Sequence, residues 1–361
     1  MLVLLGTIVL LFVLRDVFHS ATPRGMSTRF CLTPFLVQDL LWPPFSFIAR
    51  KISCPVLKAE ILSLFAPLTL LVLLVCWILL VVFGFGLITL GLGGDYLPHV
   101  KSAHDACYIS ANAVLTIGPV SEFIPNTGLV KVLMLFGALV GMILIGSILS
   151  LIFGLAAALQ PRETMVSVIS NLGGTPPSGI AILEQYCGND GQYLHSFFDE
   201  CHRWCADVLG THRAFPILPF FRSNDPHTSW LTALGAVLDA IALLISVAPD
   251  KTSVSARMTY KLGSKLLREF VAIFKLTPGA ADPIGDNEFQ RLYRQLESAG
   301  YCSSDEEEAK EKFRLLRLEY AGPYKALCEY LVVPTTCNSE FLRDHGGYQL
   351  NADIPFALEP Q

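Results

Sequence analysis

The stretch ILSLFAPLTLLVLLVCWILLVVFGFGLITLGL, residues 61–92, contains no Asp, Glu, Lys, Arg or His. As an α-helix rising about 1.5 Å per residue, it is longer than the ~30 Å hydrocarbon core of a bilayer. The whole chain is 52% hydrophobic, with a mean hydropathy of +0.51, which is too apolar for an ordinary soluble protein. The sequence therefore predicts an integral membrane protein with a membrane-spanning helix here.

Two further apolar runs predict membrane-spanning helices on either side of this one. Residues 129–159 are interrupted only by Lys131, near the start of the run, and are followed by Gln160-Pro161-Arg162. Residues 1–20 are apolar up to Arg15, and they lack the basic start and the small-residue cleavage site of a signal peptide. We therefore expect three spans, beginning near residues 1, 61 and 129.

Basic residues set the expected orientation. The loop between the first two spans carries a cluster of them, namely Arg15, Arg24, Arg29, Arg50, Lys51 and Lys58, whereas residues 93–128 carry only Lys101. By the positive-inside rule, residues 21–58 and 159–361 face the cytoplasm of a multi-pass inner-membrane protein. Within the loop, a patch interrupted by Pro43-Pro44 is expected to lie along the membrane interface: Phe35, Leu36, Leu40, Leu41, Trp42, Phe45 and Phe47.

Residues 159–361 have the pattern of a helical cytoplasmic domain. Glycines and prolines at 173–179 predict a loop, and apolar residues at spacings of three and four predict one or two amphipathic helices over 180–214. Residues 229–247 are apolar apart from Asp239. Because a lone carboxylate at mid-membrane is costly, we expect a buried soluble helix there rather than a fourth span. Residues 251–330 are charged and helical, with a solvated helix start at 305–308.

The segment between the last two spans is the most informative. Residues 103–115 are semi-apolar and form about three turns if helical, which is too short to cross a bilayer. They are followed by TIGPVSEFIP, residues 116–125, and then by the third span. Non-helical backbone at membrane depth is tolerated only where it lines water or is buried in protein.

This order of elements resembles the two-transmembrane pore-loop potassium channel superfamily, in particular bacterial channel-like proteins with a large cytoplasmic C-terminal domain. The resemblance covers about residues 60–157, and residues 216–247 look like the soluble region of such proteins. It implies an all-α membrane fold in which residues 59–158 form an outer helix, a pore helix, a filter-like loop and an inner helix, preceded by one extra N-terminal span.

In that superfamily the filter reads Thr-x-Gly-Tyr-Gly-Asp, and its carbonyl oxygens replace the water shell of the ion. The chain matches at Thr116, Ile117 and Gly118 and departs at Pro119 and Val120, with Ser121-Glu122 near the aspartate position. A filter strand needs backbone angles that alternate in hand; valine is a poor left-handed residue, and proline fixes its own φ and restricts the residue before it. Four chains can still offer a shorter ring from Thr116 and Ile117.

We therefore expect a homotetrameric channel or channel-like protein for monovalent cations, K⁺ or Na⁺, with weakened potassium selectivity. Glu122 is either an outer ring of carboxylates that attracts cations or a single solvated residue. Gly137, Gly141 and Gly146 on the third span form either a gating hinge or a close helix-packing surface.

Two other classes of protein stay open. The first is a nonconducting membrane receptor or scaffold that signals through its cytoplasmic domain, and the second, weaker one is a membrane-anchored enzyme. No catalytic motif appears, so no enzyme or cofactor is expected, and a net charge of −5 gives no reason to expect nucleic acid as a partner.

Cysteines and glycines in the C-terminal half offer weak alternatives. Cys201, His202 and Cys205, with His195 and His212 nearby, are metal-ligand types, but no second paired cluster accompanies them, so core thiols and no metal are expected. The glycines at 173–179 lack the Lys-Ser/Thr pair of a phosphate-binding loop.

Overall fold

The computed structural model describes residues 1–21, 32–118, 120–186, 191–223, 225, 228–279 and 284–333. Over these residues the chain is built from helices and one two-stranded sheet. Among the described residues, four helices are long and apolar enough to cross a membrane: Leu2–Ser20, Val56–Gly91, Gly128–Gly173 and Trp230–Val247. The chain is thus an all-α membrane protein.

Contacts divide the chain into two units. Unit 1 is Met1–Thr164 with Ala206–Pro226, and unit 2 is Met165–Cys205 with His227–Gln361. Residues 206–226 therefore group with the long apolar helices. The domain boundaries expected at residues 20, 58 and 158 stay predictions.

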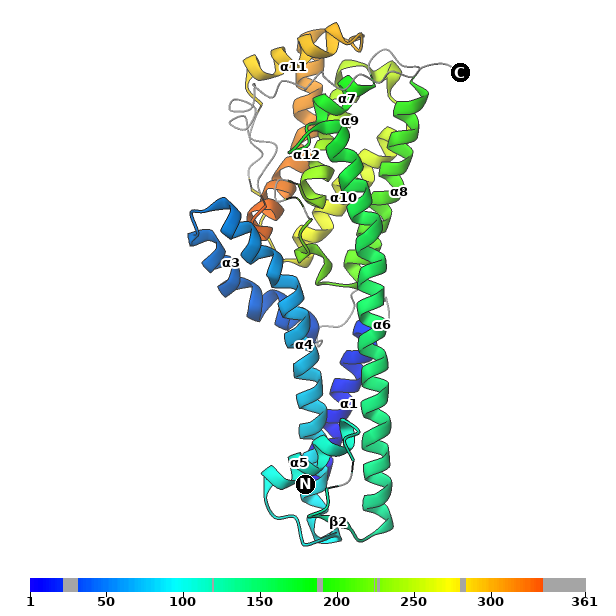
Figure 1. Cartoon of the computed structure of the whole chain (residues 1–361). Helices are drawn as coiled ribbons and strands as arrows, with labels where there is room; N and C mark the ends of the chain where they lie inside the picture. The colour runs from blue at the N-terminus through cyan, green and yellow to red at the C-terminus, as the bar shows by residue number, and fades with distance from the viewer. Residues whose placement is uncertain are drawn as a thin grey trace, which may run out of the picture. The chain divides into compact units, whose positions relative to one another are not determined.

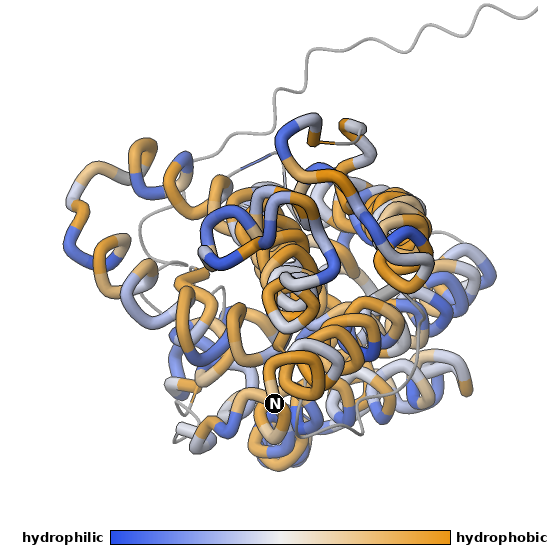
Figure 2. The backbone as a smooth tube through the Cα atoms, turned by 90° about the horizontal axis from the view of Figure 1, so that it is seen from below, coloured by the Kyte–Doolittle hydropathy of each residue, from blue (hydrophilic) through white to orange (hydrophobic). Residues whose placement is uncertain are grey.

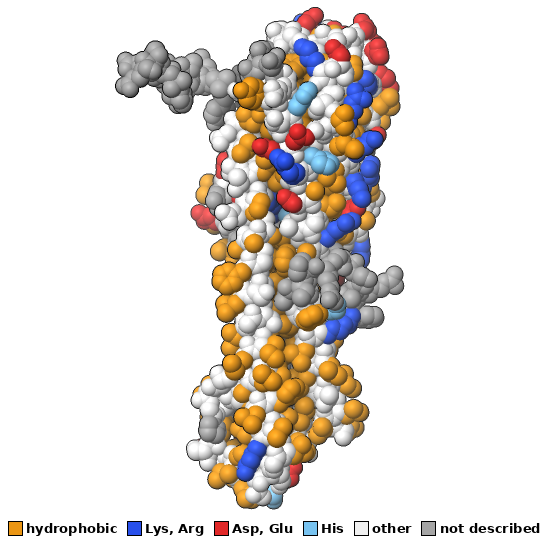
Figure 3. Space-filling model, turned by 90° about the vertical axis from the view of Figure 1, so that its right-hand side faces the viewer, with side chains coloured by type: hydrophobic (Ala, Val, Ile, Leu, Met, Phe, Trp, Pro, Cys, Tyr) orange, Lys and Arg blue, Asp and Glu red, His pale blue; other side chains and the backbone are white. Residues whose placement is uncertain are grey.

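Unit 1 is organised around α1 (Leu2–Ala21), α4 (Pro55–Gly91) and α6 (Gly128–Gly173). Glycines allow α1 and α4 to approach closely, since a Cβ on Gly6 would lie 2.5 Å from the carbonyl oxygen of Gly84. Figure 2 shows the helix that starts at the N-terminus as hydrophobic around its circumference. In Figure 3, hydrophobic side chains cover the part of the face formed by the long apolar helices, whereas charged side chains gather over unit 2.

A buried carboxylate also joins α1 to α4. Asp16, only 2% exposed, accepts a hydrogen bond from Nε1 of Trp77 at 2.8 Å and another from the backbone N–H of Leu32 at 2.7 Å. These neutral donors satisfy a charge that an apolar helix would otherwise leave unpaired. The N-terminal helix is thereby bound to α4 by packing and by hydrogen bonds.

The third apolar helix is longer than expected. The apolar run ends at residues 160–162, but α6 continues through Pro161 to Gly173, so the helix extends past the expected span. A proline removes one backbone hydrogen bond without necessarily ending a helix whose flanking turns are held by packing. At about 1.5 Å per residue α6 measures about 70 Å, so it extends well beyond a bilayer core.

The connection between α1 and α4 contains α2 (Leu32–Pro34), the π-helical segment η1 (Phe35–Leu41) and α3 (Trp42–Lys51). Only part of the expected interfacial patch is exposed. Phe47 is 60% exposed, but Trp42 is 3% exposed because its ring packs against Phe65 of α4 and Phe220 of η3 (Leu218–Phe220), each 4.8 Å away. Pro43 and Pro44 lie in the first turn of α3, where a proline fits, and do not interrupt it.

Unit 2 contains α7 (Gly179–Gln185), most of α8 (Gln192–Ala214), α9 (Trp230–Val247), η4 (Pro249–Lys251), α10 (Val254–Ile273), α11 (Asp286–Ser298) and α12 (Glu306–Leu331). Residues 180–214 thus form two helices, after a turn at 174–177. Asp305 begins α12 by accepting a hydrogen bond from the Glu307 N–H at 3.2 Å, as expected for the acidic run.

Helix α9 is the centre of unit 2 and packs against α7, α10 and α12. Its most apolar stretch is 89% buried, against 28%, 39% and 22% for α1, α4 and α6. Asp239 accepts a hydrogen bond from the Tyr320 hydroxyl and lies 4.0 Å from Nε of Arg317. The rest of the chain therefore covers most of α9, as expected for a buried helix, and its place outside the membrane stays a prediction.

Candidate functional site

The short helix between the last two long apolar helices is α5 (Ala103–Val114). Ser102 begins it by accepting a hydrogen bond from the His104 N–H at 3.2 Å. It packs along α4, where Gly86 leaves room for Cys107, since a Cβ on Gly86 would lie 2.9 Å from Sγ of Cys107. Twelve residues extend only about 18 Å, so α5 ends beside α4 without crossing a bilayer.

The C-terminal end of α5 meets α6 at a fixed level. A Cβ on Gly141 would lie 1.8 Å from the carbonyl oxygen of Val114, and one on Gly137 would lie 3.5 Å from Cβ of Ala113. At about 1.5 Å per residue, Gly141 lies about 20 Å along α6 from Gly128. The end of α5 therefore lies beside the apolar stretch of α6, about 20 Å from the start of that helix. The backbone of Val114 comes so close to α6 that residue 141 must be a glycine.

The connection between α4 and α6 begins and ends at the same end of these two helices. Strand β1 (Tyr96–Leu97) pairs antiparallel with β2 (Ile124–Pro125), so that Tyr96 is opposite Pro125. Figure 1 shows α5 and β2 at the end of α1 and α4 where the N-terminus lies, with α3 at the opposite end of α4. The chain thus leaves α4, descends through α5 and returns to its starting level before α6 begins.

Residues 116–118 have a backbone that alternates in hand. Thr116 has φ +55° and Gly118 has φ +126°, whereas Ile117 between them has no positive φ. The N–H groups of Thr116 and Ile117 donate to the carbonyl oxygens of Ala113 and Asn112 at 3.2 and 3.0 Å, which ends α5. These two bonds and the left-handed Thr116 form the Schellman motif that ends many helices, and α12 ends in the same way at Val332, whose φ is also +55°.

The positive φ values at this loop are those of Thr116 and Gly118, and Pro119 lies outside the described residues. Ile117 is 70% exposed, and Thr116, Ser121 and Glu122 are exposed as well. Of the predicted filter residues, Thr116, Ile117 and Glu122 therefore lie on the surface of a single chain, whereas Gly118 and Val120 are half-buried.

The three glycines expected on α6 have different surroundings. Gly137 and Gly141 face α5, but close packing requires a glycine only at 141, since a Cβ on Gly137 would make an ordinary contact with Ala113. A Cβ on Gly146 would meet nothing within 4 Å. Close packing within the chain therefore does not explain Gly146, and its role as a hinge stays a prediction.

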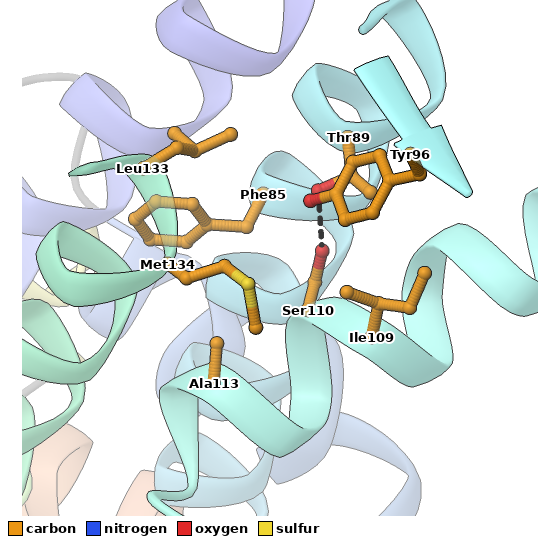
Figure 4. A pocket seen from close by; sticks show the side chains of 8 residues that line it. All are labelled: Phe85, Thr89, Tyr96, Ile109, Ser110, Ala113, Leu133 and Met134. Atoms are coloured by element: carbon orange, nitrogen blue, oxygen red, sulfur yellow. Dashed lines mark hydrogen bonds between the residues drawn. The ribbon is translucent and has the colours of Figure 1, made fainter. Parts of the chain in front are cut away.

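A small cavity lies behind α5 (Figure 4). It has about 10 Å³ of space for the centre of a water-sized sphere, room for about one water molecule. Residues from α4, β1, α5 and α6 line it: Phe85, Thr89, Tyr96, Ile109, Ser110, Ala113, Leu133 and Met134. The Thr89 and Ser110 hydroxyls are 3.1 Å apart, and burial raises the pKa of the Tyr96 phenol. This cavity is too small for an organic substrate.

The cysteines weighed as metal ligands are buried in unit 2. Cys201 and Cys205 are both 0% exposed, and burial raises the pKa of both thiols, that of Cys205 to about 12. Among the described residues, no group of three or more His, Cys, Asp or Glu side chains could hold a metal ion. Their surroundings fit packed core thiols.

Unit 1 contains a buried cation that no sequence pattern predicts. Arg162, 2% exposed, forms an ion pair with Glu163 at 2.6 Å and donates to the carbonyl oxygens of Leu218 and Phe221, each at 2.9 Å. Nε2 of the buried His212 lies 3.5 Å from Nη1 of Arg162. An arginine that follows an apolar run normally indicates the membrane boundary, and carbonyl partners more than fifty residues away leave no sequence pattern.

The chain was compared with protein-family models, with curated proteins and with solved structures. None of the three comparisons gives a significant match.

Proposed function

We propose that this protein is a homotetrameric cation channel or channel-like protein of the inner membrane. In this proposal α4 and α6 are the outer and inner helices, α5 is the pore helix, and residues 116–118 form a filter-like loop. Unit 2 is a cytoplasmic regulatory domain.

The observation that carries the proposal is an exposed, irregular stretch of backbone that lies beside the apolar part of α6, far from the end of that helix. Residues 115–118 are non-helical, and they follow an α5 terminus that is level with Gly141, about 20 Å along α6. Non-helical backbone cannot face lipid, because its polar groups would find no hydrogen-bond partners. Copies of the chain around an axis would instead place these residues against one another and against water.

The chemistry of the loop suits a weakly selective cation path. Carbonyl oxygens and the Thr116 hydroxyl can replace part of the water shell of K⁺ or Na⁺. The Thr-x-Gly match at residues 116–118 favours a short ring of such oxygens, and Pro119 and Val120 in place of the aromatic residue and the second glycine favour reduced selectivity for potassium. Glu122, exposed just beyond the loop, can attract cations to the entrance in four copies.

A nonconducting membrane receptor or scaffold is the second candidate. The replacement of the aromatic residue and second glycine of the filter by Pro119 and Val120 favours it. In that case the loop residues would pack against each other on the axis and exclude ions, while unit 2 would carry the function.

Ion flux from liposomes under a potassium or sodium gradient tests the proposal. The parent is compared with Gly118→Asp and Glu122→Gln, and with Gly128→Ala as a control glycine with nothing within 4 Å of the added Cβ. We expect flux from the parent and the control and none from Gly118→Asp. Correctly assembled oligomers without flux under either gradient would instead support the receptor or scaffold.

A further inference from the structure

Arg162 lies on the C-terminal part of α6 and is buried although it carries a fixed charge. An arginine is seldom buried unless its N–H groups have acceptors, because removing the charge from water is costly. Here the carboxylate of Glu163 accepts from Nε and Nη2 at 2.8 and 2.6 Å, and two backbone carbonyl oxygens accept from Nη1 and Nη2. Planar guanidinium geometry allows these bonds at once, which an ammonium group cannot reproduce.

The two carbonyl groups belong to a segment that also touches α6 elsewhere. A Cβ on Gly154 would lie 3.2 Å from Cζ of Phe215, so the ring of Phe215 lies directly on the helix. Residues 215–221 therefore rest on α6 at two places about two turns apart, Gly154 and Arg162. We name residues 215–221 the clamp segment.

The clamp segment contacts a second group of helices through Phe220. Its ring lies 4.8 Å from the ring of Trp42 in α3 and 5.4 Å from that of Phe65 in α4, and all three side chains are at most 3% exposed. Packed aromatic rings of this kind hold their neighbours at fixed distances. Arg162 and Phe220 thus connect α6 to α3 and to the start of α4 within unit 1.

Arg162 and the loop at residues 116–118 are joined by one helix. From Gly141, which touches the end of α5, to Arg162 the helix α6 runs about 30 Å without a break. Gly146 lies between them and has open space around it. A displacement of α6 at Arg162 is therefore transmitted along the helix or absorbed by bending near Gly146.

We infer that Arg162 is a positioning residue that holds the inner helix outward, against α3 and α4, and so keeps the pore open at that end. This inference rests on the proposed channel function. Without the guanidinium, the clamp segment loses its polar attachment to α6, and the inner helix is free to move toward the axis. Loss of the attachment therefore lowers the open probability and leaves the loop at 116–118 intact.

Single-channel recording of the full chain in planar bilayers, with hydrogen exchange in nanodiscs, tests this role. For Arg162→Gln we expect faster hydrogen exchange of the clamp segment amides. We also expect an open probability at least about tenfold lower, because the loss of one charge-assisted hydrogen bond shifts an equilibrium by about that factor. Single-channel conductance and reversal potential stay at the parent values. Arg162→Lys is expected to be intermediate, and Arg294→Gln, on the exposed surface of unit 2, is the matched control.

Each other outcome overturns the inference. If the open probability of Arg162→Gln stays within twofold of the parent while the clamp segment exchanges faster, the attachment is merely structural. A rise in open probability contradicts the inference that Arg162 holds the inner helix α6 outward. If Arg162→Gln does not fold, Glu163→Gln, at a residue 30% exposed, provides the milder test. A parent without current refutes the proposed function and the gating role together, whereas a conducting parent with unchanged gating refutes only the role of Arg162.

Discussion

Replacing Gly141 by alanine should disrupt the contact between the pore helix α5 and α6. The added Cβ would lie 1.8 Å from the carbonyl oxygen of Val114, whereas carbon and oxygen meet at roughly 3.3 Å. One of the two helices must therefore move by about 1.5 Å. Overpacking of this kind typically costs about 1–3 kcal/mol, and here the contacting atom is backbone, which gives way less easily than a side chain.

Gly146→Ala is the matched control on the same helix. Nothing lies within 4 Å of its added Cβ, so alanine should stabilise the helix by about 0.5–1 kcal/mol through its higher helix propensity. Thermal unfolding in detergent gives the comparison between the two variants, and the flux of Gly141→Ala is compared with that of the parent. We expect a lower midpoint and reduced flux for Gly141→Ala, and an equal or higher midpoint for Gly146→Ala. Equal midpoints for the two variants, with parent-like flux for Gly141→Ala, would refute the contact between the end of α5 and Gly141.

Three further predictions concern other parts of unit 1. Trp77→Phe removes the indole N–H that donates to Asp16 and should lower the free energy of unfolding by about 1.5–3 kcal/mol, measured by chemical denaturation; no change would mean that the carboxylate needs no such donor. Glu122→Gln should reduce conductance at low salt and have little effect near 1 M salt, where the Debye length is about 3 Å; a reduction that persists at high salt would contradict attraction by charge. Burial, and secondarily Arg162, lowers the pKa of His212 well below its ordinary value. The unfolded chain therefore binds the extra proton, and stability should rise with pH up to about 6.5, the pKa of a free histidine, and then level off. His212→Gln should remove this part of the pH dependence of unfolding, and an unchanged profile would show that other groups cause it.

Hydropathy made the long helices predictable. Long runs without acidic residues predict membrane-spanning helices at 61–92 and 129–159, and all of these residues except Leu92 lie within α4 and α6. Asp239 made the interior position of α9 predictable, because a carboxylate in an apolar helix needs partners, which Tyr320 and Arg317 provide. Hydropathy did not predict the continuation of α6 past Pro161, since this depends on packing that holds the turns on both sides of the proline.

The candidate site was predictable in position and less so in conformation. The Thr-x-Gly pattern indicated the loop after α5, and the need for a left-handed residue indicated Gly118. The positive φ of Thr116 was not predicted, because a β-branched residue rarely adopts it. The burial of Arg162 and Trp42 was not predicted either, because their partners in residues 218–221 are distant in the sequence.

The most direct test of the central proposal is the accessibility of residue 117 to water in the assembled protein. Ile117→Cys is treated in liposomes with a membrane-impermeant thiol reagent, with the parent as the control for the native cysteines, and both modification and flux are followed. A loop that lines an aqueous axis predicts modification of this residue and block of the flux. A cysteine at 117 that stays unmodified until the protein is denatured would contradict the proposed pore.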